Sequence, residues 1–222
     1  MLYIVMEVYN YLHNNESIIH SELSKLVSAF NSSNNPSEKK KKRRRNKKSN
    51  AKINTDNNSN ILLKYFEKHE IDKNILDLLL TMPGQLYLYG NGSTILHEYC
   101  KKDNVERSCI TSILGSFKYL HRIKDRQSLY PINYYVTCRN RIDLESNILT
   151  ELGENLKYEF DHTNNDYLIN YLTSNEYPET DIILALESVF PITTTNSNDD
   201  SALSCYLKYS KNIFFPTVKI LS

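Results

Sequence analysis

The sequence predicts an all-α protein built from repeated helix–turn–helix units. Two observations lead to this prediction. From residue 61 onward, short apolar segments recur at steps of 34, 36, 37 and 34 residues. A second apolar cluster follows each of the first four segments by about a dozen residues. Because residues three or four apart share one face of a helix, each unit is expected to contain two short amphipathic helices.

The first helix of each unit is placed by an apolar residue with Tyr or Leu three positions later. These pairs are Leu62 and Tyr65, Leu96 and Tyr99, Ile132 and Tyr135, Ile169 and Leu172, and Leu203 and Tyr206. One helix pair cannot enclose a core of its own. Successive units are therefore expected to stack side by side and to bury their apolar faces in a continuous strip.

The second helix of each complete unit is placed by an apolar pair four residues apart. The clusters span residues 75–79, 110–114, 148–152 and 182–186. Gly115 and Gly153 directly follow two of these clusters. Helices commonly end in a glycine with left-handed backbone conformation, so we expect both glycines to end their helices in this way.

These patterns divide the chain into three regions. Residues 1–30 show partial helical spacing and form a short amphipathic segment, which either packs on the next region or binds a partner. Residues 31–60 are rich in Asn, Ser and Lys and form a disordered polybasic linker. Residues 61–222 hold the repeats, with units at 61–90, 91–124, 125–160 and 161–195 and an incomplete unit at 196–222.

The linker contains nine basic residues within ten positions. They are Lys39, Lys40, Lys41, Lys42, Arg43, Arg44, Arg45, Lys47 and Lys48. Without them the chain has 27 − 9 = 18 basic against 26 acidic residues, a balance of −8. The tract suits a nuclear-import signal or contacts with nucleic-acid phosphates, and a solubilising spacer explains it equally well. No aromatic residue interrupts it, which argues against base stacking there.

The segment 92–97 resembles the ankyrin signature G-x-T-P-L-H. Its matching residues are Gly92, Thr94, Leu96 and His97, with Ile95 where proline is usual, and Pro131 matches the signature proline in the next unit. Thr94 can cap the first helix. The resemblance implies that the His97 side chain hydrogen-bonds the neighbouring unit. Asn133 and Asn170 replace this histidine in the next two units, and Ser204 replaces it in the last one.

The chain is similar to poxvirus ankyrin proteins of the orthopoxvirus host-range and immune-modulator type. Like them, it has repeat spacings longer than 33 residues and is rich in Ile, Asn, Tyr and Lys. The likeness is strongest at 70–79, 92–99 and 217–222. It implies a host protein as partner, a place in the host cytoplasm or nucleus, and an effect on antiviral signalling or host range. Such proteins commonly end in an F-box-like segment that recruits ubiquitin ligases. None follows the incomplete last unit, so we expect a truncated member in which this recruitment is in doubt.

The sequence contains no recognisable catalytic, cofactor-binding or metal-binding motif. Its six histidines lack a metal-ligand spacing such as H-E-x-x-H, and its four cysteines form no C-x-x-C. The glycines of 89–92 are explained by a turn rather than a phosphate loop. No apolar run approaches the roughly 20 residues that span a bilayer. We therefore expect no enzyme, no cofactor and no membrane partner.

Two functional hypotheses remain. The first is a protein-interaction scaffold, which would lose its partner when exposed turn residues such as Asn91 or Asp125 are replaced. The second is a nucleic-acid-binding or nuclear-targeted protein that acts through residues 39–48. The first is favoured because the repeats occupy most of the chain.

Overall fold

The computed structural model describes residues 2–15, 17–33, 61–82, 89, 92–137, 144–154, 156, 167–175, 177–190 and 200–222. Within these ranges the regular elements are helices and no strand occurs, which confirms the all-α prediction. The tract 39–48 and most of the predicted linker lie outside the described residues, as does Asn91. Among the described helices, none combines the length and apolar character that crossing a bilayer requires.

Successive helices form antiparallel pairs. The pairs are α1 (Leu2–Asn14) with α2 (His20–Ser33), α3 (Ile61–Lys68) with α4 (Lys73–Leu80), α5 (Ile95–Cys100) with α6 (Arg107–Ser116), α7 (Pro131–Thr137) with α8 (Ser146–Gly153), α9 (Tyr167–Ser174) with α10 (Thr180–Val189), and α11 (Ala202–Tyr209) with α12 (Phe215–Leu221). A short 3₁₀ helix, η3 (Leu120–Arg122), lies in the connection between α6 and α7.

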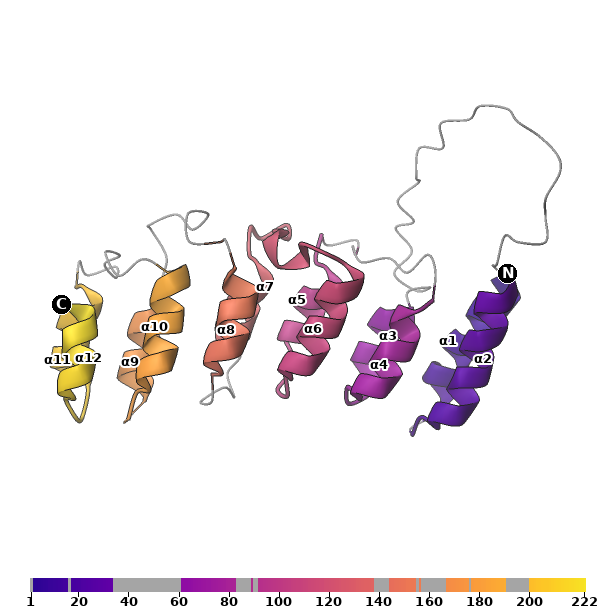
Figure 1. Ribbon diagram of the computed structural model, residues 1–222, viewed down its shortest axis with the longest axis horizontal. Helices are drawn as coiled ribbons and strands as arrows, with labels where there is room; N and C mark the ends of the chain where they lie inside the picture. The colour runs from indigo at the N-terminus through magenta and orange to yellow at the C-terminus, as the bar shows by residue number, and fades with distance from the viewer. Residues whose placement is uncertain are drawn as a thin grey trace, which may run out of the picture.

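The helix pairs stand side by side in a row, from α1 and α2 in indigo to α11 and α12 in yellow (Figure 1). The second helices contact one another along the whole row, and the first helices do so from α1 to α7 and from α9 to α11. The described turns within pairs, such as 69–72 and 101–106, lie along one edge of the row, here called the turn edge (Figure 1). The described connection between pairs, residues 117–130, lies along the opposite edge, here called the connection edge (Figure 1). This arrangement buries one continuous strip of apolar side chains.

The N-terminal pair is part of this row. Val8, Leu12, Leu23 and Val27 are fully or almost fully buried and belong to the same apolar core as the later pairs. At the turn edge, the Lys68 Nζ donates to the His13 carbonyl at 2.7 Å. Of the two alternatives for the N-terminal segment, the structure therefore supports packing on the next region. Helix α2 also runs three residues beyond the predicted boundary at 30.

A tyrosine in the first helix of every pair accepts a hydrogen bond from the backbone just before the second helix. The hydroxyls of Tyr11, Tyr65, Tyr99, Tyr135, Tyr171 and Tyr206 accept from the N–H groups of Ile19, Asp72, Glu106, Glu145, Glu179 and Phe214, at 2.8–3.0 Å. These N–H groups would otherwise lack a partner at the helix start. The bond thus marks one equivalent position in each pair.

This position corrects the predicted alignment of the unit that contains α9. The bonded residue is Tyr171, so its partner three residues earlier is Leu168 rather than Ile169. The steps between units become 34, 36, 36 and 35 residues, counted from Tyr65 to Tyr99, Tyr135, Tyr171 and Tyr206. The sequence alone allowed either choice, because Leu168 and Ile169 are both apolar.

The prediction for the two glycines was wrong. Gly115 and Gly153 lie inside the final turns of α6 and α8, and the positive φ angles of the described residues belong to Gly92, Tyr119 and Ser128. A Cβ atom on Gly153 would lie 2.1 Å from Cγ2 of Val189 in α10, whereas one on Gly115 would meet nothing within 4 Å. Gly153 therefore permits the close approach of two neighbouring pairs.

Candidate functional site

Two turns at the connection edge share a pair of backbone hydrogen bonds and a positive φ at the equivalent residue. In the first, the Tyr89 N–H donates to the Ser93 carbonyl and the Gly92 N–H donates to the Tyr89 carbonyl, both at 2.8 Å. In the second, the Asp125 N–H donates to the Leu129 carbonyl and the Ser128 N–H donates to the Asp125 carbonyl, both at 3.0 Å. The fourth residue of each turn has a positive φ, 79° at Gly92 and 63° at Ser128. The two turns lie 125 − 89 = 36 residues apart.

Thr94 and His97 form a capping box directly after the first turn. The Thr94 hydroxyl accepts from the His97 N–H at 3.4 Å, and the Thr94 N–H donates to Nδ1 of His97 at 3.0 Å. The Nε2 of His97 lies 3.0 Å from the Leu129 carbonyl in the second turn. A carbonyl can only accept, so Nε2 carries a proton. Nδ1 accepts from the Thr94 N–H and therefore carries none, so the imidazole is neutral. His97 thereby connects the first pair-to-pair turn to the second.

Asn133 repeats this arrangement in the next pair. Its Oδ1 accepts from the Tyr130 N–H at 2.7 Å, and its Nδ2 donates to the Tyr167 hydroxyl at 3.1 Å. The amide therefore replaces both functions of the imidazole. Pro131 is buried and begins α7, at a position where a missing N–H costs nothing.

The predicted role of Asn170 was wrong, because the alignment of its unit was shifted by one residue. In the corrected alignment the buried Ile169 corresponds to His97 and Asn133, and Asn170 is exposed. In the last pair, Ser204 corresponds to His97 and is exposed, while the hydroxyl of Ser201 caps α11 by accepting from the Ser204 N–H at 3.2 Å.

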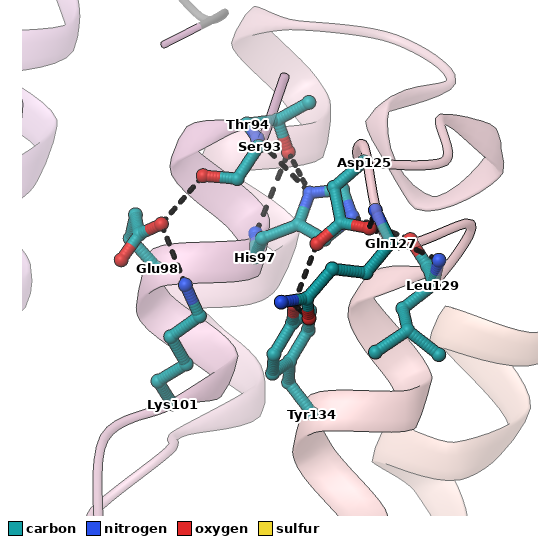
Figure 2. A network of polar contacts seen from close by, with 9 residues as sticks. All are labelled: Ser93, Thr94, His97, Glu98, Lys101, Asp125, Gln127, Leu129 and Tyr134. Atoms are coloured by element: carbon teal, nitrogen blue, oxygen red, sulfur yellow. Dashed lines mark hydrogen bonds and ion pairs between the residues drawn. The ribbon is translucent and has the colours of Figure 1, made fainter. Parts of the chain in front are cut away.

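A chain of polar contacts extends from this capping box across two pairs (Figure 2). Ser93 donates to the Glu98 carboxylate, which also pairs with Lys101 at 2.8 Å. The Lys101 ammonium lies 4.7 Å from the centre of the Tyr134 ring in α7. The Tyr134 hydroxyl in turn donates to the Asp125 carboxylate.

The Asp125 carboxylate stabilises the second turn from inside. One of its oxygens accepts from the N–H groups of Gln127 at 2.9 Å and Leu129 at 3.0 Å. Burial opposes the ionised form, but the hydrogen bonds from Tyr134, Leu129 and Gln127 prevail and hold the pKa of Asp125 below its ordinary value. The predicted use of Asp125 as an exposed contact residue therefore conflicts with its geometry.

Two titratable groups that contact or neighbour Asp125, His97 and Tyr134, are instead held in their neutral forms. Burial lowers the pKa of His97 from its ordinary value of 6.5. Burial, the hydrogen bond to Asp125 and its charge raise the pKa of Tyr134. Because both ring nitrogens of His97 and the Asp125 carboxylate already have protein partners, the network is suited to holding two turns in place rather than to proton transfer.

The tip of the second turn is exposed, although the Gln127 side chain accepts a hydrogen bond from the Tyr134 hydroxyl at 3.2 Å. Arg126, Gln127 and Ser128 are exposed there, above a first-helix row whose outward positions include the exposed Lys101 and Asn170. Among the described residues, no three His, Cys, Asp or Glu side chains gather as metal ligands. Sequence reasoning missed this network. The i, i+3 spacing of Glu98 and Lys101 is a signal that could have predicted their ion pair, whereas the contacts between pairs join residues far apart in the sequence.

Comparisons with protein-family models, with curated proteins and with solved structures find no match for the chain. Its function is therefore inferred from its own residues and geometry.

Proposed function

We propose that the chain is a non-enzymatic protein-interaction scaffold of degenerate ankyrin repeats, similar to those of poxvirus host-range proteins. Its partner is a host protein of the cytoplasm or nucleus, and binding without turnover modulates antiviral signalling or host range. Repeats of this kind offer partners an extended surface made of the first helices and the turns between pairs.

One observation carries the proposal above the others. Two turns with the same hydrogen bonds lie 36 residues apart, and the first is tied to the second by the His97 side chain of a G-x-T-x-L-H segment. That segment resembles the ankyrin signature, in which the histidine has this role. The repeated stacking of the helix pairs and the tyrosine bond common to all of them further support a repeat architecture.

The binding surface follows from the division of the row into two faces. The first helices and the turn tips form one face, and the second helices form the other. Asn170 is an exposed residue on a first helix, and Asn147 is an exposed residue on a second helix. Neither side chain has a hydrogen bond among those of the described residues, so both can be replaced without breaking a known contact.

The proposal is tested with two matched variants, Asn170→Arg and Asn147→Arg. Proteins crosslinked to the full chain in transfected cells would be identified, and the strongest of them purified for calorimetric titration. We expect this partner to bind the unmodified chain and Asn147→Arg with one affinity, and Asn170→Arg at least roughly tenfold more weakly, which corresponds to about 1.4 kcal/mol. Equal affinity for both variants, or no protein partner at all, would contradict the proposal.

A further inference from the structure

The connection between α6 and α7 carries a dense positive charge. Residues 117–130 contain Lys118, Arg122, Lys124 and Arg126 and a single acidic residue, Asp125. All four basic side chains are exposed. The Asp125 carboxylate is engaged by Tyr134 and by the turn backbone, so it is directed into the fold rather than toward these cations. The segment therefore presents four positive charges to solvent.

Aromatic rings are interleaved with these charges. The Tyr119 ring is 64% exposed, and the Arg122 guanidinium carbon lies 5.9 Å from its centre. The Lys124 ammonium lies 5.0 Å from the centre of the Tyr130 ring, which is buried, so Tyr119 is the ring that this segment offers to a ligand. A cation over one face of an exposed ring leaves the remaining surface of that ring open to a ligand. This differs from the tract 39–48, which has no aromatic residue.

Tyr119 also has an unusual backbone conformation. Its φ of 69° and ψ of 11° place it in the left-handed region, which a residue with a large side chain rarely occupies. The side chain gains no burial in return, since most of it is exposed. Folding alone would favour Asn or Gly at this position, so the ring is better explained by a contact with another molecule.

We propose that residues 118–126 form a binding site for single-stranded nucleic acid. The four cations neutralise phosphates, and the Tyr119 ring stacks on an unpaired base. An acidic peptide would satisfy the cations but would make no use of the exposed ring face. A duplex would also satisfy the cations, but its bases are already stacked on one another. The combination of cations and a free ring therefore favours a single strand.

This site shares Arg126 with the turn tip of the surface proposed for the protein partner, and it is separate from the tract 39–48. It consists of described residues on the connection edge between two neighbouring pairs. The protein-scaffold proposal can fail without affecting it, because Asn170 and Asn147 lie on other helices.

The test measures binding of the full chain to fluorescein-labelled oligothymidylate. A probe of about 20 nucleotides exceeds the roughly 4 to 16 that one small domain covers. Measurements are made in the natural chain and in a background with the nine basic residues of 39–48 changed to Gln. Tyr119→Asn keeps the left-handed backbone and removes the ring, so loss of binding cannot be ascribed to misfolding. We expect at least roughly fivefold weaker binding in both backgrounds, and near-normal binding by Tyr119→Phe.

Tyr177→Asn is the matched control. Tyr177 is 68% exposed but lies in the turn between α9 and α10, and its replacement should leave binding unchanged. Arg122→Gln and Lys124→Gln should each reduce the slope of log affinity against log salt by about 0.7. The proposal is overturned if Tyr119→Asn binds like the natural chain. It is also overturned if the duplex or a polyglutamate peptide binds as tightly as the single strand.

Discussion

Polar bonds made by the first helices and their flanking turns link neighbouring pairs at opposite edges in the middle of the row and toward its ends. Between the second helices, by contrast, Arg107 and Thr111 bond Glu151 and Asn31 bonds Thr81. In the middle, His97 and Asn133 reach the next pair at the connection edge. Toward the ends, the bonds lie at the turn edge. There Nε2 of His69 is 2.8 Å from the Leu12 carbonyl, and the Ser210 hydroxyl donates to the Leu172 carbonyl at 3.2 Å.

The difference shows which contacts define the repeat. Apolar stacking and the tyrosine bond occur in every pair, whereas the bond between pairs is made by different residue types at different edges. The position of His97 is therefore filled by Asn133, Ile169 and Ser204 in later pairs. A signature based on the inter-pair bond weakens along the chain even though the packing persists.

The largest effect is expected where two second helices come closest. Gly153→Ala would place a methyl group against the buried, stiff side chain of Val189, and we expect a loss of about 3 kcal/mol in the free energy of unfolding. Gly115→Ala is the matched control. Its Cβ meets nothing, so better helix propensity should stabilise the chain by up to about 1 kcal/mol. Urea denaturation followed by circular dichroism measures both.

A double variant separates the steric clash from other causes. Adding Val189→Ala to Gly153→Ala removes the opposing methyl groups, so the double variant should be more stable than the sum of the two single losses predicts. Strictly additive losses would show that the close approach of α8 and α10 is not the reason for the glycine.

The next largest effect is expected at the bonds between pairs, where the His97 bond in the middle of the row is compared with the Ser210 bond near its end. His97→Ala leaves the Thr94 N–H and the Leu129 carbonyl without their buried partner, and we expect a loss of about 2 kcal/mol. Ser210→Ala removes a half-buried bond whose acceptor can turn to water, so we expect about 0.5 kcal/mol. Equal losses in urea denaturation would contradict the distinction between middle and end bonds.

The sequence was sufficient to predict the all-α fold and most first helices, because their apolar spacing is regular. It failed at α9, where two adjacent apolar residues fit the same spacing and only the Tyr171 bond distinguishes them. It also separated the N-terminal pair from the repeats. Tyr11 and Tyr65 occupy equivalent positions but lie 65 − 11 = 54 residues apart, a step that the segment 31–60 lengthens beyond the others.

At the candidate site, the sequence predicted the residues at the capping box better than it predicted their partners. Thr94 and His97 are close in the chain, so their motif is visible as a local pattern. The acceptor for His97 lies 32 residues away, in a turn whose sequence shares little with the turn before it. Gly92 and Ser128 adopt the same backbone conformation with different residues, and only coordinates bring that likeness to light.

A smaller effect tests the contact that all pairs share. Tyr99→Phe and Tyr171→Phe each remove one hydrogen bond to a helix start, and each should cost about 1 kcal/mol in urea denaturation. Tyr177→Phe, at an exposed tyrosine, should cost nothing measurable. A free energy of unfolding unchanged by Tyr171→Phe would show that the corrected alignment of α9 is mistaken.

The smallest effect is a dependence of stability on pH, and it compares the bonds of His97 with those of Asn133. Burial lowers the pKa of His97 below its ordinary value of 6.5, so below that pH the unfolded chain binds more protons than the folded chain. The contribution of neutral His97 to stability is therefore complete above pH 6.5 and falls as the solution becomes more acidic. Since Asn133 makes the corresponding bonds without titrating, His97→Asn should keep the bond and remove this pH dependence. The free energies of unfolding of the two chains should be similar above pH 6.5 and should diverge on acidification, because only the natural chain loses this contribution. Parallel pH profiles would show that His97 does not titrate differently in the folded chain.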